Sequence, residues 1–224
     1  MSTEHWQSQA TSVRRAMADN SVVTFAELLL MRDAHGHMAP QMEPPSGAVP
    51  RSAAALLLLY PQDGELRVPL TVRTGHLPTH KGQVSLPGGS TDPDDDGPAA
   101  TALREAEEEL GIPPASVEVL GVLSSFYITP SNFMLTPVVG LSTTAPDLRP
   151  HPGEVELVFS VPLRQLLDPA SIITEEWDLH GMRLQVPFFA LAGQKVWGAT
   201  AVALSEFVAR LRKVTRGRGD AGTR

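Results

Sequence analysis

Residues 98–112 read PAATALREAEEELGI, and this stretch has the pattern of one amphipathic helix. Its apolar residues recur every three or four positions, so they share one face that we expect to pack on a β-sheet. They are Ala99, Leu103, Ala106 and Leu110. Pro98 suits the first helical turn, Asp96 or Gly97 can cap it, and Gly111 predicts the end of the helix.

Three carboxylates converge on the same helix. Glu105, Glu108 and Glu109 stand at i, i+3 and i+4, within an arc of about 100°. Like charges at this spacing disfavour a helix by about 0.2–0.5 kcal/mol per pair, and acids in the last turn oppose the helix dipole. A hard divalent cation would remove the repulsion. The pattern therefore predicts a metal site; the alternative is a solvated acidic face on which Arg104 pairs with Glu108.

The net charge of the chain is concentrated in this region. Residues 92–109 contain eight acids and one arginine, so they carry all of the formal charge of −7, and the rest of the chain is neutral. This balance excludes a basic surface for non-specific nucleic-acid binding. Immediately upstream, Gly88-Gly89 allows the backbone to approach a phosphate closely, and Arg104 can brace the carboxylates.

Outward from the helix, strands and helices are interleaved without an internal repeat. Strands are predicted at Ser52–Tyr60, Leu66–Thr74, Val117–Phe126, Met134–Leu141, Val155–Val161 and Leu184–Phe189, with a turn at 61–64 and a loop over 75–89. Helices are predicted at Leu163–Leu167 and Ala199–Leu211. The fold class is therefore α/β (α+β).

One folded domain is expected, with an extension at each end. Residues 10–32 have a mixed helical pattern, and four prolines between 39 and 50 predict an extended linker. We therefore expect an N-terminal helical and Pro-rich extension over 1–50, a main domain over 51–212, and a basic flexible tail over 213–224.

Composition excludes several classes of protein. Cysteine is absent, which excludes disulfides, thiolate nucleophiles and iron–sulfur clusters. The longest apolar run, Ala53–Tyr60, is too short to cross a membrane, and no basic-then-apolar leader begins the chain. We expect a cytoplasmic protein that binds neither nucleic acid nor membrane.

Residues 104–112, REAEEELGI, resemble the core of the Nudix box, R-E-U-x-E-E-x-G-U, at every defined position. The full pattern begins G-x5-E-x7 before the arginine; here Asp96 stands at the glutamate position and Ser90 at the glycine position, one residue after Gly89. The resemblance implies a Nudix α/β/α sandwich, with a central mixed β-sheet between helices.

The preceding segment, 70–89, is similar to the signature of the coenzyme A diphosphatase branch of the Nudix family. The spacing and the glycines match, whereas Pro78 replaces an arginine and Leu86 a phenylalanine. Segments 127–130, 136–140, 152–155 and 197–201 are also similar to that branch. The resemblance implies that water cleaves the pyrophosphate of coenzyme A, giving 3′,5′-ADP and 4′-phosphopantetheine, with Mg²⁺ or Mn²⁺.

The resemblance also implies roles for individual residues. Glu105 and Glu109 are the expected main metal ligands, completed by Glu108 and a carbonyl of Gly88 or Gly89. Glu154 is a candidate ligand or general base, the alternative being a surface acid. The residues expected to hold substrate are Arg73, His80, Lys81, Gly88, Gly89 and Tyr127. For His80 the alternative is a solvated loop residue, and for Tyr127 it is core packing.

Other functions remain open or are excluded by single residues. The Asp-rich loop 92–97 imitates the start of an EF-hand, but Leu103 stands where that loop needs glutamate. Walker and G-x-S-x-G motifs are absent. A Nudix hydrolase acting on ADP-ribose, a dinucleotide or a damaged nucleotide remains open, as do a catalytically silent Nudix module that binds a nucleotide and a homodimer.

Overall fold

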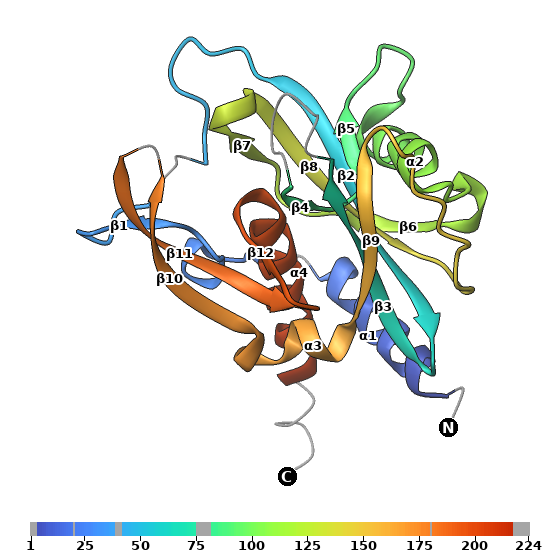
Figure 1. Cartoon of the computed structure of the whole chain (residues 1–224). Helices are drawn as coiled ribbons and strands as arrows, with labels where there is room; N and C mark the ends of the chain where they lie inside the picture. The colour runs from blue at the N-terminus through green and yellow to red at the C-terminus, as the bar shows by residue number, and fades with distance from the viewer. Residues whose placement is uncertain (1–3, 20, 39–41, 75–81, 180, 217–224) are drawn as a thin grey trace.

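The computed structural model describes residues 4–19, 21–38, 42–74, 82–179 and 181–216, which form two β-sheets and the helices that cover them (Figure 1). The α-helices are α1 (Glu4–Ala18), α2 (Gly97–Leu110), α3 (Leu163–Leu167) and α4 (Gly198–Arg216). Short 3-10 turns lie at Phe25–Glu27, Pro114–Ser116, Thr129–Ser131 and Pro169–Ser171.

The larger sheet is mixed, with β2 at its centre. Its strands are β2 (Arg51–Gln62), β3 (Glu65–Arg73), β4 (Val84–Ser85), β5 (Gly88–Ser90), β6 (Glu118–Val122), β7 (Phe126–Ile128), β8 (Phe133–Leu141) and β9 (Val155–Pro162). β2 pairs in parallel with β8, and antiparallel with β5 at its start and with β3 at its end. β3 then pairs with β9.

Alternate residues of β2 enter two separate hydrophobic cores. Ala54, Leu56 and Leu58 pack beneath α2 with Ala102, Ala106 and Leu110. The intervening residues Ala55, Leu57 and Leu59 face the opposite core, which contains buried residues of α1 and α4. Because both faces of the strand are covered, its sequence is a continuous apolar run instead of an alternating one. This arrangement is the predicted α/β/α sandwich, with α2 on one face and α1 and α4 on the other.

A second, antiparallel sheet was not predicted. It consists of β1 (Arg32–Asp33), β10 (Ile172–Leu179), β11 (Met182–Leu191) and β12 (Gln194–Val196), and lies beside α4 in Figure 1. Only the part of β11 between Leu184 and Phe189 was expected. β10 contains exposed polar residues such as Glu176 and Asp178, so it lacks the apolar alternation from which strands are recognised.

Several predicted boundaries are corrected. The segment 117–126 divides into β6 and β7, and Gly88-Gly89 is part of the short strand β5, paired with β2, instead of a loop. α4 continues to Arg216, so residues 213–216 of the predicted basic tail are helical, and Lys213 Nζ donates to the carbonyl of Val22. Residues 217–224 lie outside the described part of the chain.

The N-terminal extension shares its core with the rest of the molecule. Ala10, Val13 and Ala16 of α1 are at most 1% exposed, and α1 packs against α4, β3 and β6. The expected boundary at residue 50 therefore does not separate two hydrophobic cores. Over the described residues, none of the helices is both long enough and apolar enough to cross a membrane.

Candidate active site

The acidic helix α2 lies against the glycine strand β5. A Cβ atom built on Gly89 would lie 2.5 Å from the carboxyl carbon of Glu105, which is closer than packed atoms approach. A side chain at this position would displace the carboxyl group of Glu105, so glycine lets that group pack against the backbone of β5. The contact brings the two features singled out in the sequence, the Gly-Gly pair and the glutamates, into one place.

Glu109 is the most buried of the three glutamates, with its side chain 3% exposed. Its Oε1 lies 3.6 Å from Nη1 of Arg73, whereas its Oε2 is buried without a hydrogen-bond partner among the described residues. Burial raises the pKa of Glu109 to about 7; the charge of Arg73 opposes this effect, and the charges of Glu154 and Glu105 add to it. A buried carboxylate oxygen without a partner indicates a missing cation or donor.

Glu154 is brought to the buried Glu109 and the partly buried Glu105 by the loop that follows β8. His151 donates its backbone N–H to the carbonyl of Glu109 at 2.8 Å, and Thr74 donates to the carbonyl of Glu154 at 3.0 Å. Glu154 is half-buried, and its charge raises the pKa of both Glu105 and Glu109. Glu154 lies 45 positions or more beyond the three glutamates of α2 in sequence. The fold brings it to them, and we define the acidic cluster as Glu105, Glu108, Glu109 and Glu154.

Glu105 and Glu108 share one cationic neighbour. Nη1 of Arg104 donates to Glu105 at 3.0 Å and to Glu108 at 3.1 Å. Glu105 is partly buried, and burial raises its pKa despite the contact with Arg104. Glu108 is 58% exposed, so it stands at the rim of the cluster. Arg104 therefore contacts both carboxylates; its bond to the exposed Glu108 is also the contact that the alternative, a solvated acidic face, predicts.

The sequence pattern did not identify Asp95 as part of this site. Asp95 accepts two hydrogen bonds from Arg104, at 3.1 Å and 2.9 Å, and the guanidinium holds the pKa of that carboxyl well below its usual range. The neighbouring Asp96, which the motif aligns with its conserved acid, is exposed. The sequence did contain one indication of this contact. Arg104 is the single arginine among the eight acids of residues 92–109, so partners outside its own helix could be expected.

The chemistry of the cluster fits a hard divalent cation. Within the described residues no three His, Asp or Glu side chains are already arranged around a single metal position. Arg73 contacts Glu109, and Arg104 contacts Glu105 and Glu108. Mg²⁺ typically takes only one or two carboxylates and fills its other positions with water and substrate oxygens, and the unpartnered Oε2 of Glu109 offers one such ligand.

The remaining predicted substrate-binding residues are His80, Lys81 and Tyr127. His80 and Lys81 lie outside the described residues. Tyr127 on β7 is 7% exposed, and its hydroxyl donates to Asn132 at 3.1 Å. Burial of the ring favours core packing, which the sequence left as the alternative to a role in holding substrate.

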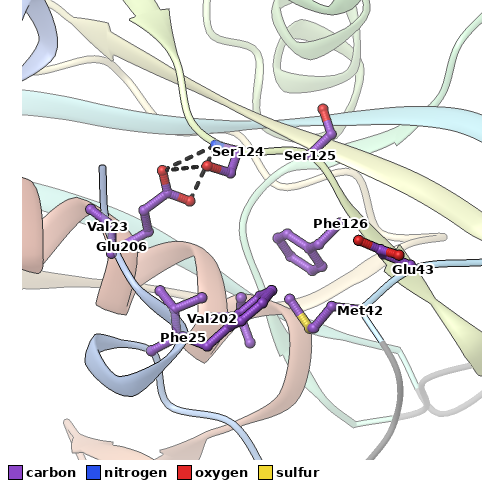
Figure 2. A pocket seen from close by; sticks show the side chains of 10 residues that line it. Val23, Phe25, Met42, Glu43, Ser124, Ser125, Phe126, Val202 and Glu206 are labelled. Carbon is purple, nitrogen blue, oxygen red and sulfur yellow. Dashed lines mark hydrogen bonds between the residues drawn. The ribbon is translucent and has the colours of Figure 1, made fainter. Parts of the chain in front are cut away.

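A cavity of about 220 Å³ lies away from α2, between β7, α4 and the N-terminal segment. Figure 2 shows Phe25, Met42 and Phe126 around it, with Glu206 turned toward Ser124. The Glu206 carboxylate accepts from the N–H and the hydroxyl of Ser124, and from Arg210 at 2.8 Å. Its charge is therefore compensated within the fold, and none of the predicted site residues lines this cavity.

Comparison with known proteins agrees with this architecture. A family model described as the NUDIX domain matches residues 49–179. The chain is 39% identical over 171 residues to Nudix hydrolase 15, mitochondrial, of Arabidopsis thaliana (73% of this chain, 60% of that one). It is 39% identical over 159 residues to Nudix hydrolase 22, chloroplastic, of the same plant (68% and 52%).

A bacterial relative is covered more completely. The chain is 40% identical over 165 residues to the uncharacterized Nudix hydrolase NudL of Escherichia fergusonii, covering 72% of this chain and 83% of that one. The two plant relatives are longer, and the chain spans only 60% and 52% of their lengths. With the family model matching more than half of its residues, the chain belongs to the Nudix family.

Proposed function

We propose that this chain is a metal-dependent pyrophosphohydrolase that cleaves coenzyme A or a derivative to 3′,5′-ADP and 4′-phosphopantetheine or its acylated form. The observation that carries the proposal is the buried carboxylate of Glu109, whose Oε2 has no hydrogen-bond partner among the described residues. Its Oε1 lies 3.6 Å from Arg73, and the charges of Glu105 and Glu154 act on it. The similarity of residues 70–89 to the coenzyme A diphosphatase signature supports the substrate.

The cation would be held by Glu105 and Glu109, with Glu108 and a carbonyl oxygen of Gly89 or Gly88 completing the oxygen ligands. A Cβ atom on Gly89 would collide with the carboxyl group of Glu105, so this carboxyl group lies close to the backbone of Gly89. When bound, Mg²⁺ or Mn²⁺ supplies positive charge that neutralises the pyrophosphate and lowers the pKa of water.

The protein's own groups then bind, orient and move protons. Glu154, half-buried at the edge of the cluster, is the candidate base that accepts a proton from the attacking water. Arg104 holds Glu105 and Glu108 in place. Arg73, 3.6 Å from Glu109, supplies a cation that can pair with a substrate phosphate once a metal ion satisfies Glu109.

A second substrate class is favoured by one specific residue. Pro78 stands where the coenzyme A signature has arginine, so one cationic substrate contact of that signature is missing. A Nudix pyrophosphatase acting on ADP-ribose, a dinucleotide or a damaged nucleotide would not need this contact. The two candidate functions use the same acidic cluster, and their substrates differ only in the chemical groups attached to the pyrophosphate.

A substrate panel distinguishes these candidates. Coenzyme A, acetyl-coenzyme A, ADP-ribose and a diadenosine polyphosphate are incubated with the protein and Mg²⁺ or Mn²⁺, and products are identified by mass spectrometry. We expect 3′,5′-ADP from the coenzyme A substrates at the highest kcat/KM. Preference for ADP-ribose or the dinucleotide would favour the second candidate, and no hydrolysis of any substrate would indicate a binding module.

Glu109→Gln tests the metal-binding role. Gln keeps the shape and removes the charge, so we expect kcat to fall about 10³-fold, the equivalent of about 4 kcal/mol, while the circular dichroism spectrum stays unchanged. Glu107→Gln is the matched control, because Glu107 is an exposed acid on the same helix. A folded Glu109→Gln variant with the wild-type rate would remove the basis of the proposal.

A further inference from the structure

The guanidinium of Arg104 has a partner for each of its five N–H groups. Nε–H donates to Oδ1 of Asp95 at 3.1 Å, and Nη2 donates to Oδ2 of Asp95 and to the carbonyl of Ser90, both at 2.9 Å. The two N–H groups of Nη1 go to Glu105 and Glu108. One side of the planar group is thus fixed to the acidic loop and to β5, and the other side holds the glutamates.

Asp95 is built into this position more firmly than its neighbours. Its carboxylate is 7% exposed and also accepts the backbone N–H of Asp92 at 2.9 Å. The Asp92 carboxylate is 62% exposed and lies 3.8 Å from Nε of Arg104, too far for a hydrogen bond. Asp96 is exposed at the N-terminus of α2, and its side chain makes no capping hydrogen bond.

We propose that Asp95, and not the motif-aligned Asp96, is a positioning residue for the metal ligands, acting through Arg104; this inference rests on the proposed function. With Asp95 in place, each glutamate receives a single N–H from Arg104 and keeps its other oxygen for a cation. Without it, the freed Nε–H and Nη2–H turn toward the nearest acids. A guanidinium that pairs with Glu105 through two N–H groups competes directly with a divalent ion.

The test compares Asp95→Asn with Asp96→Asn, which remove the same charge from adjacent positions. Mn²⁺ binding to the substrate-free protein is measured by electron paramagnetic resonance, and the free energy of unfolding by urea titration. We expect the Kd for Mn²⁺ to rise 10- to 100-fold in Asp95→Asn and to stay within twofold in Asp96→Asn, as outer-shell partners of metal ligands typically behave. Asn caps a helix as well as Asp, so the control leaves α2 intact.

A double-mutant cycle tests whether the effect passes through Arg104. In an Arg104→Gln background, Asp95→Asn is expected to change the Kd for Mn²⁺ less than twofold, because the connection is already broken. With coenzyme A as substrate, Asp95→Asn should raise the Mn²⁺ concentration needed for half-maximal rate by the same 10- to 100-fold while KM at saturating Mn²⁺ stays unchanged. Should Asp95→Asn fail to fold, Asp95→Glu retains the charge, shifts the carboxylate by one methylene, and is assessed by the same two measurements.

The outcomes separate this proposal from the proposed function. Equal Mn²⁺ affinities in Asp95→Asn and Asp96→Asn, with a wild type that binds Mn²⁺ and hydrolyses substrate, would overturn the role of Asp95 alone. If Asp95→Asn raises the Kd for Mn²⁺ as much in the Arg104→Gln background as in the wild type, Asp95 does not act through Arg104. A wild type that neither binds Mn²⁺ nor hydrolyses any pyrophosphate would overturn the proposed function, and this inference with it.

Discussion

Glu109 is held by the fold in a state that costs free energy when no cation is present. Its carboxylate is nearly inaccessible to water, one of its oxygens has no hydrogen-bond partner in the described part of the chain, and the charges of two other acids act on it. Arg73 compensates only part of this cost, from 3.6 Å. Such a group favours protonation, which is why its pKa lies near 7 instead of 4.5.

This shift predicts how the stability of the metal-free protein depends on pH. Because the folded pKa of about 7 exceeds the unfolded value of 4.5, the protonated form stabilises the fold below pH 4.5. That contribution is lost as pH rises through about 7, and amounts to about 3 kcal/mol at 1.36 kcal/mol per pKa unit. Urea unfolding in EDTA between pH 5 and 8 should therefore show falling stability for the wild type.

Glu109→Gln provides the control for this prediction. The variant cannot ionise at this position, so its stability should fall less steeply over the same pH range, leaving the smaller contribution of Glu105, whose pKa is also raised. Mg²⁺ should restore the stability of the wild type at pH 8 and leave the stability of the variant nearly unchanged. If the free energy of unfolding falls equally with pH in the two proteins, burial does not raise the pKa of Glu109.

At the scale of elements, the site depends on where α2 ends. Gly111 adopts a left-handed conformation (φ 68°), and its N–H donates to the carbonyl of Glu107 at 2.8 Å. The loop that carries Glu154 then attaches to the last residues of the helix, since Arg149 donates to the carbonyl of Leu110 and His151 to that of Glu109, both at 2.8 Å. The helix end therefore positions both Glu109 and Glu154.

Gly111→Ala should lower the free energy of unfolding by about 1–2 kcal/mol, because a side chain disfavours the left-handed region. Gly111→Asn is the comparison, since Asn adopts that region more readily and would meet the same Arg149 Cβ, 3.3 Å away. We expect Asn to recover part of the loss in urea unfolding. Equal losses for Ala and Asn would assign the effect to crowding by Arg149 instead of backbone conformation.

Elements were predictable where periodicity was strong. The α2 helix follows its apolar repeat and its terminating glycine, and β2 follows a continuous apolar run, so both were located from sequence. β5 was missed because two glycines have low strand propensity and pair with β2 only through their backbones. β10 was missed because an edge strand with exposed acids carries little apolar signal.

At the scale of the whole molecule, α1 shares a hydrophobic core with α4 and the larger sheet. Val13 is fully buried in the cluster that also contains Leu57 and Phe207. Val13→Ala should therefore destabilise the entire protein by about 2 kcal/mol, near the lower end for large-to-small core substitutions. The measurement is urea unfolding followed by circular dichroism and by tryptophan fluorescence.

Arg15→Ala provides the control for Val13→Ala, because Arg15 is exposed on the same helix and should change stability by less than about 0.5 kcal/mol. Coincident transitions by both probes are expected if α1 and the sheets unfold together. Equal stabilities for the two variants, or a separate early transition, would show that α1 is an independent extension.

The sequence by itself determined the helix, the strand beneath it, the family resemblance and the glutamates, since these depend on residue spacing along one element. Only the tertiary structure decided that Glu109 is buried, that Glu154 joins it, and that Asp95 instead of Asp96 holds Arg104. Burial and pairing depend on which segments meet. The loop over 149–155 and the acidic turn with Asp95, nine residues before Arg104, each contact α2 only when the chain has folded.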